Sequence, residues 1–178
     1  MLERELLPLL NESEFELYHK IFEEFKFGSR ERAWLLTRIY PFEGFLGVPK
    51  FRSRRRFRQA LGFGKITSAS GKSSVTSRKN SGAVSVHSVI FCWVEYRISK
   101  GLASQLKKPG VPKLNKWDCC PQTPAGKEIQ EFFVKRAYYP ESLQKKSGKL
   151  LVGAKSATGR KAVEILFNRF YDKWCSQF

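Results

Sequence analysis

The segment SEFELYHKIFEEFKFGSRERAWLLTRIY, residues 13–40, decides the fold class of this chain. Its first half carries apolar residues at the three- and four-residue spacing of an amphipathic helix, namely Phe15, Leu17, Tyr18, Ile21, Phe22 and Phe25. Asn11 or Ser13 can cap this helix, and Gly28 is expected to end it. A second helix is predicted from Ser29. It should stop at Tyr40, because a residue that precedes proline avoids the helical conformation.

Helical spacing recurs in four further segments, at residues 54–61, 84–98, 127–138 and 159–174. In the first of these, Ser53 is the expected N-cap and Gly62 the expected end. Phe57 and Leu61 lie one turn apart and face inward, which leaves the arginines of this helix outside. The second segment is rich in β-branched residues, so a strand is the alternative there.

Two other segments lack this periodicity. Residues 66–82 are rich in serine, glycine and lysine, which predicts a basic loop, either a flexible linker or a mobile functional loop. Residues 107–126 contain four prolines and are expected to form an irregular insertion. We therefore predict one all-α domain over residues 1–178. It consists of a helix-hairpin-helix-like part at 14–62, the basic loop, and a helical remainder at 83–178 that includes the insertion.

The composition is that of a folded and strongly basic protein. Hydrophobic residues make up 42% of the chain, enough to fill a core, and the formal net charge is +17 with a pI near 10.0. The first 31 residues are net acidic, so the positive charge is concentrated in the rest of the chain. An excess of cations on this scale is typical of a protein that binds a polyanion.

The sequence also bears on location. The longest nearly uncharged apolar run, residues 84–94, is much shorter than the roughly 20 residues of a membrane-spanning helix, so no membrane partner is expected. The start of the chain is acidic where a signal peptide is basic. The cysteines lack the spacing of a disulfide framework. We expect a cytoplasmic protein with free thiols.

Residue spacing disfavours several kinds of chemistry. Gly71-Lys72-Ser73 is similar to the end of a P-loop, but Ile66 stands where the first glycine of that motif is required. Cys119-Cys120 are adjacent, and His19 and His87 lie far from them, so we expect no metal and no cofactor in this chain. Two histidines without a glycine–serine elbow leave a hydrolase with no evident base.

Six cations within nine residues form the main candidate binding site: Lys50, Arg52, Arg54, Arg55, Arg56 and Arg58. No acid lies within this cluster to form i,i+4 pairs, so DNA phosphates that relieve the repulsion are the favoured partner. The alternative is an ordinary solvated helix face. A second candidate is the turn Gly28-Ser29-Arg30, because a turn that leads into a helix presents unpaired amides to an anion.

The order of these features resembles one transposase family. The matching parts are the Gly28 hairpin, the helix Ala33–Ile39, the segment Phe51–Gly62, the pair Ser70-Gly71 eight residues after Gly62, the basic stretch that follows it, and the last helix. In these parts the chain is similar to the C-terminal half of the insertion-sequence transposases understood as RNA-guided recombinases, the family numbered one hundred and ten.

The resemblance implies a function in DNA transposition and recombination. In that family the serine of the Ser-Gly pair attacks a DNA phosphodiester, which implies that Ser70 is the nucleophile. On chemical grounds Lys72, which lies beside it in sequence, is a further candidate to bind the DNA strand. Whether a guide RNA takes part is left open. The family's RNase-H-like domain with four acidic residues has no counterpart here. We therefore expect a fragment that is either a remnant or acts with that missing domain or with other transposase chains.

Two alternatives stay open on the sequence alone. One is a non-enzymatic, basic helical subunit that coats RNA or DNA in a larger complex. The other is an RNA-binding protein of ribosomal type, against which the long helices and the 14% aromatic content argue.

Overall fold

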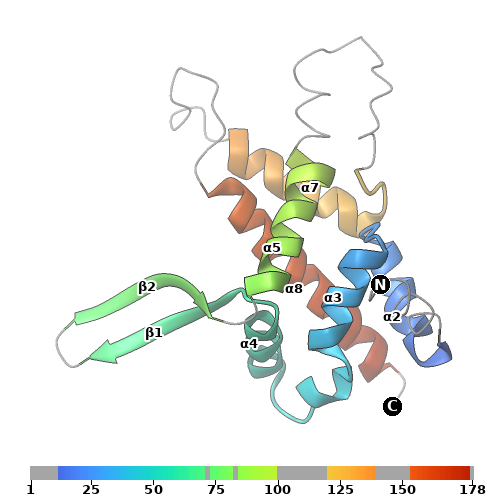
Figure 1. Cartoon of the computed structure of the whole chain (residues 1–178), viewed down its shortest axis with the longest axis horizontal. Coiled ribbons are helices and arrows are strands. Elements are labelled where there is room, and N and C mark those ends of the chain that lie inside the picture. Colours follow the sequence, from blue (N-terminus) through green and yellow to red (C-terminus); the bar gives the residue numbers. More distant parts are fainter. Residues whose placement is uncertain (1–11, 71–72, 82–83, 100–119, 139–152, 177–178) are drawn as a thin grey trace, which may run out of the picture.

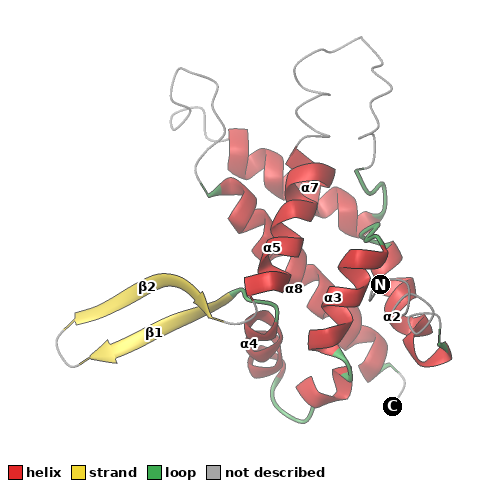
Figure 2. Cartoon of the chain, viewed as in Figure 1, coloured by secondary structure: helices red, strands yellow, loops and turns green. Residues whose placement is uncertain are grey.

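A computed structural model of the chain describes residues 12–70, 73–81, 84–99, 120–138 and 153–176 (Figure 1). Its elements follow in the order η1 (Ser13–Phe15), α2 (Glu16–Glu23), α3 (Ser29–Ile39), η2 (Phe42–Phe45), α4 (Lys50–Ala60), β1 (Gly64–Ser70), β2 (Ser73–Ser81), α5 (Val84–Trp93), η3 (Val94–Ser99), α7 (Pro124–Tyr138) and α8 (Ala154–Cys175). Helices build the body of the molecule, as predicted, while β1 and β2 project from it as a hairpin (Figure 2).

Helix α8 is the axis of the fold. It packs against α2, α4, α5, α7 and η3 and crosses the centre of the molecule (Figure 1). Its buried side includes the residues that the sequence predicted to share one face: Val163, Leu166, Phe167, Phe170 and Trp174. The helix begins at Ala154, earlier than predicted, directly after Gly153, whose φ of 86° is left-handed. None of the described helices, α8 included, has the length and apolarity needed to span a membrane.

The short helix η2 joins the N-terminal helices to α8. The ring of Phe42 lies 5.2 Å from that of Phe170 and 5.1 Å from that of Trp174. The Phe42 amide donates a 2.7 Å hydrogen bond to the Tyr18 hydroxyl oxygen, and burial raises the pKa of Tyr18 to about 12. Trp174 Nε1 donates to Glu43 at 2.6 Å. Helix η2 is thus part of the core and leads into α4.

The helix boundaries at Gly28 and Ser53 also differ from the prediction. Gly28 does not end the first helix: α2 ends at Glu23, the reversal uses Lys26 at φ 50°, and Gly28 precedes α3 at φ −74°. Ser53 is not an N-cap, because α4 begins three residues earlier, at Lys50. Pro49 accounts for the early start, since proline is well suited to the beginning of a helix.

In the segment predicted as a basic loop at 66–82, the described residues 66–70 and 73–81 have extended structure instead. β1 and β2 pair antiparallel from Gly64↔Ser81 to Ser70↔Ser73, with an irregularity between Lys65 and Ile66. Both strands contain β-branched residues, which favour extended backbone. The many serines of the segment are typical of a loop, and this composition led to the wrong prediction. The hairpin extends away from the body beside α4 (Figure 1).

The predicted insertion at 107–126 is described only at its end, since residues 100–119 lie outside the described part of the chain. From Cys120 to Thr123 the backbone is irregular, as expected. The last three residues of the predicted insertion, 124–126, already belong to α7, because proline is tolerated in the first turn of a helix.

Candidate nucleic-acid interface

Helix α4 carries the predicted cation cluster, and local hydrogen bonds fix both of its ends. At its start the Pro49 carbonyl accepts the Arg52 amide at 2.8 Å. At its end Gly62 has a φ of 79° and donates to the Gln59 carbonyl at 3.0 Å. The Phe63 amide donates to the Arg58 carbonyl at 2.8 Å, which completes a Schellman motif. The prediction that Gly62 closes this helix is confirmed.

One side of α4 is anchored in the core, and this sets the direction of the cations. Phe57 is fully buried, with its ring 5.5 Å from Phe167 and 5.9 Å from Phe42. Ser53, one turn earlier, is also buried and donates to the Val48 carbonyl at 3.3 Å. Phe57 and Ser53 define the side of α4 that faces the core. The basic residues therefore lie on the rest of the helix surface, some toward α8 and some toward solvent.

A second side of α4 faces α8, and two of its cations, Lys50 and Arg54, have acidic partners there. Lys50 Nζ lies 3.2 Å from Asp172 and 4.6 Å from the centre of the Tyr171 ring. Arg54 lies 2.9 Å from Glu164. The expectation that the cluster lacks counterions is therefore wrong for Lys50 and Arg54. Their acids come from a helix more than a hundred residues away in sequence.

The third side, which we call the open face, consists of Arg52, Arg55 and Arg56. All three side chains are exposed, and within the described part of the chain none forms an ion pair. Phe51 at its start is 62% exposed, and the Arg52 guanidinium lies 5.7 Å from the centre of its ring. The open face thus combines concentrated positive charge with an accessible aromatic ring.

The remaining cation of the cluster, Arg58, lines a cleft of about 280 Å³ with residues from α7 and α8: Phe132, Arg136, Ala157, Arg160, Lys161 and Glu164. The sequence pattern did not indicate the basic residues of α7 and α8, because they are separated from Arg58 by many residues. The adjacent basic pairs Lys135-Arg136 and Arg160-Lys161 were the local signs of them.

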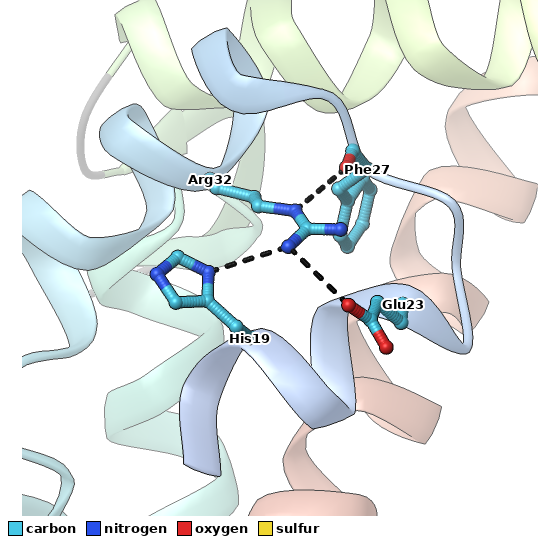
Figure 3. A network of polar contacts seen from close by, with 4 residues as sticks. All are labelled: His19, Glu23, Phe27 and Arg32. Carbon is cyan, nitrogen blue, oxygen red and sulfur yellow. Dashed lines mark hydrogen bonds and ion pairs between the residues drawn. The ribbon is translucent and has the colours of Figure 1, made fainter. Parts of the chain in front are cut away.

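The Gly28 turn is held by the network in Figure 3. Arg32 Nε donates to the Phe27 carbonyl at 2.8 Å, and its Nη1 lies 3.4 Å from His19 Nδ1 and 3.9 Å from Glu23. These contacts join α2 to α3.

Of the predicted residues in this turn, Ser29 and Arg30 are exposed. Glu31 lies in the same turn of α3, and its Oε2 would be only 2.7 Å from a Cβ added at Gly28. This carboxylate beside the helix start opposes a second anion, so the Gly28 turn is a weaker candidate than the open face.

The predicted nucleophile belongs to the hairpin rather than to a helix or loop. Ser70 is the last residue of β1 and pairs with Ser73 across the turn. Seven residues of strand extend roughly 20 Å, so Ser70 lies near the far end of the hairpin. Lys72 lies outside the described residues.

His87 of α5 lies close to the cleft. Its ring centre is 4.5 Å from that of Phe63, and the Arg160 charge reaches it. Burial, and secondarily the Arg160 guanidinium, lower the pKa of His87. Among the described residues there is no group of three His, Cys, Asp or Glu side chains placed to hold a metal ion.

Fold and charge together define a small helical protein whose helix α4 presents an open cationic face beside a basic cleft. Comparison with protein-family models, with curated proteins and with solved structures found no match to this chain.

Proposed function

We propose that this protein binds DNA through its phosphate backbone, with the open face of α4 as the contact. The observation that carries this proposal is the distribution of counterions along one helix. Lys50 and Arg54 have acidic partners on α8, whereas Arg52, Arg55 and Arg56 are exposed and have none among the described residues. A polyanion supplies the missing negative charge and releases its own bound cations when it does so.

The spacing of the open face suits a phosphate strand. Arg52 and Arg56 are four residues apart, an axial distance of about 6 Å in a helix. Phosphates of one DNA strand follow each other at about 3.4 Å along the duplex axis, so this distance corresponds to about two of them. Guanidinium groups favour phosphate because their planar donors can bind two oxygens at once. Contacts of this kind position a protein on DNA and do not by themselves read its sequence.

The test is direct binding. At low ionic strength the purified protein should bind a labelled 20-base-pair duplex of arbitrary sequence, measured by fluorescence anisotropy, and increasing salt should release it. A protein that leaves the duplex free at low salt does not have the proposed function.

A more specific proposal is that DNA binding serves transposition, with Ser70 as nucleophile and the segment at 14–62 acting as a helix-hairpin-helix. Its support is the order and spacing of sequence features. In the reaction the Ser70 hydroxyl loses its proton, its oxygen forms a bond to phosphorus, and a P–O bond of the strand breaks to release a hydroxyl end. In the resembling family an acidic, RNase-H-like domain assists this step.

This finer proposal has its own test. Protein and duplex are incubated with cell extract that supplies an acidic, RNase-H-like domain, and denaturing gels are used to detect covalent protein–DNA species. Ser70→Ala should abolish the species and leave noncovalent affinity unchanged, and Ser68→Ala is the matched control. Equal behaviour of both variants and the parent would favour a non-enzymatic DNA-binding subunit.

A further inference from the structure

The basic cleft at the end of α4 is separate from the open face. Arg58 of α4, Phe132 and Arg136 of α7, and Arg160 of α8 surround it, with Ala157, Lys161 and Glu164 completing the wall. Its volume is about 280 Å³. One water molecule occupies about 30 Å³ of liquid, so the cleft can hold a ligand considerably larger than a single water.

The ion pairs at the cleft leave an excess of positive charge. Glu164, the acid in its wall, lies 2.9 Å from Arg54, and Lys161 lies 2.8 Å from Glu128. This leaves three guanidinium groups, those of Arg58, Arg136 and Arg160, without an ion pair in the described part of the chain. Guanidinium groups stay charged throughout the physiological pH range, so the excess cannot be removed by deprotonation.

The geometry of α4 on α8 explains where this excess arises. Lys50, Arg54 and Arg58 follow one another at four-residue intervals along the side of α4 that faces α8. The two helices run antiparallel, so the first cation meets Asp172 and the second meets Glu164. At the third position α8 presents Arg160 and Lys161 in place of an acid.

Arg58 adds an unsatisfied donor at this point. Its Nε is buried and makes no hydrogen bond within the described part of the chain. This places part of the Arg58 guanidinium out of water, where its charge attracts an anion more strongly than at a fully hydrated position. A site lined by three guanidinium groups without ion pairs among the described residues is complementary to a compact anion with several oxygens.

We propose that this cleft binds a phosphate monoester group. Three guanidinium forks match the three terminal oxygens and the double negative charge of such a group, since arginine binds phosphate oxygens in pairs. Phe132 and Ala157 supply an apolar wall for the organic part attached to the phosphate. The site does not depend on DNA binding by the open face, because the two share no residue.

A thermal-shift experiment tests the site with inorganic phosphate as the probe. Unfolding is followed in sodium phosphate and in sodium chloride of equal ionic strength. For a chain of this size, phosphate at about twenty times its Kd should raise the Tm by about 4–7 °C over chloride. Arg160→Gln should abolish the difference. Arg38→Gln, which removes one exposed charge of α3 outside both the cleft and the open face, should preserve it.

Oligonucleotides distinguish the two sources of a phosphate monoester. If the ligand is the end of a nucleic-acid strand, a 5′-phosphorylated oligonucleotide should bind more tightly than its 5′-hydroxyl counterpart, and Arg160→Gln should remove that preference. If the ligand is a small phosphorylated metabolite, a nucleoside monophosphate should stabilise the protein as phosphate does, without a preference among oligonucleotides. Either result upholds the site.

Two outcomes overturn the proposal. One is an equal Tm in phosphate and chloride for the parent protein, and the other is an equal phosphate effect in the Arg160→Gln and Arg38→Gln variants. Arg160-dependent stabilisation by phosphate in a protein that does not bind duplex DNA would uphold the cleft and refute the function proposed above.

Discussion

The division of α4 into a paired side and an open face leads to a quantitative prediction for two double variants of equal charge. Arg55→Gln/Arg56→Gln removes two cations from the open face. Lys50→Gln/Arg54→Gln removes two cations that are held by Asp172 and Glu164. Both variants lower the net charge by two, so a general loss of attraction to DNA affects them alike. Only the first should remove phosphate contacts.

The expected size follows from counterion release. For duplex DNA the slope of log K against log salt is about −0.9 for each phosphate that the protein neutralises. Loss of two contacts should therefore make the slope less steep by about 1.8. Between 50 mM and 200 mM salt the parent protein should lose about twelve-fold more affinity than the open-face variant. The variant of the paired side should keep the parental slope.

Fluorescence anisotropy with one labelled duplex at four or five salt concentrations gives the slopes, and circular dichroism shows that both variants are folded. The paired-side variant should be destabilised by no more than about 1 kcal/mol per ion pair, because both pairs are largely exposed. Parallel slopes for the two variants would refute the assignment of the open face as the contact surface.

Three further predictions concern the scaffold. Phe57→Ala should lower the free energy of unfolding by about 3–5 kcal/mol in urea titrations, because a fully buried ring is removed. Phe51→Ala on the same helix should change it by less than about 0.5 kcal/mol, because that ring is exposed. Similar losses in both variants would contradict the packing of α4. Gly126→Ala should destabilise the protein by about 1–3 kcal/mol or more in thermal scans, since the added Cβ would lie 2.2 Å from the Pro121 carbonyl oxygen. Gly44→Ala is the control, because a Cβ added there meets nothing within 4 Å. The pKa of His87 is lower in the folded protein than in the unfolded chain, so the unfolded chain takes up more protons and stability should fall as pH decreases through about 6.5. His87→Gln should weaken this loss when Tm is compared at pH 7.5 and 5.5, and an unchanged pH profile would contradict the burial of the ring.

The features that the sequence predicted correctly are those with local causes. The buried side of α8, the pair Phe57 and Leu61, and the end of α4 at Gly62 each follow from residues within a few turns of one another. The start of α4 was misplaced although it too is local, because Pro49 and Ser53 are competing start signals and the sequence alone does not rank them.

The errors about the site have a different origin. The acidic partners of Lys50 and Arg54 lie on α8, 122 and 110 residues away in sequence. Patterns of neighbouring residues do not predict ion pairs over such separations. The cleft depends in the same way on three separate helices. The strand pairing of Gly64–Ser70 with Ser73–Ser81 is local, but its serines gave the sequence the composition of a loop. The cations of α4 are therefore evident from the sequence, but the tertiary structure is needed to show which of them pair with α8 and which are exposed.

Solubility is the simplest competing explanation for the unpaired cations, because a net charge far from zero keeps a protein dispersed. Solubility, however, is served equally well by charges spread over the whole surface. Here three arginines lie within five residues on one side of one helix, and three more meet in an adjoining cleft. Close placement raises the repulsion among them and contributes nothing further to dispersion. Asp172 and Glu164 show that α8 can place an acid opposite α4 wherever a cation is to be neutralised. Positive charge left open beside such pairs is better explained by negative charge that arrives with a ligand.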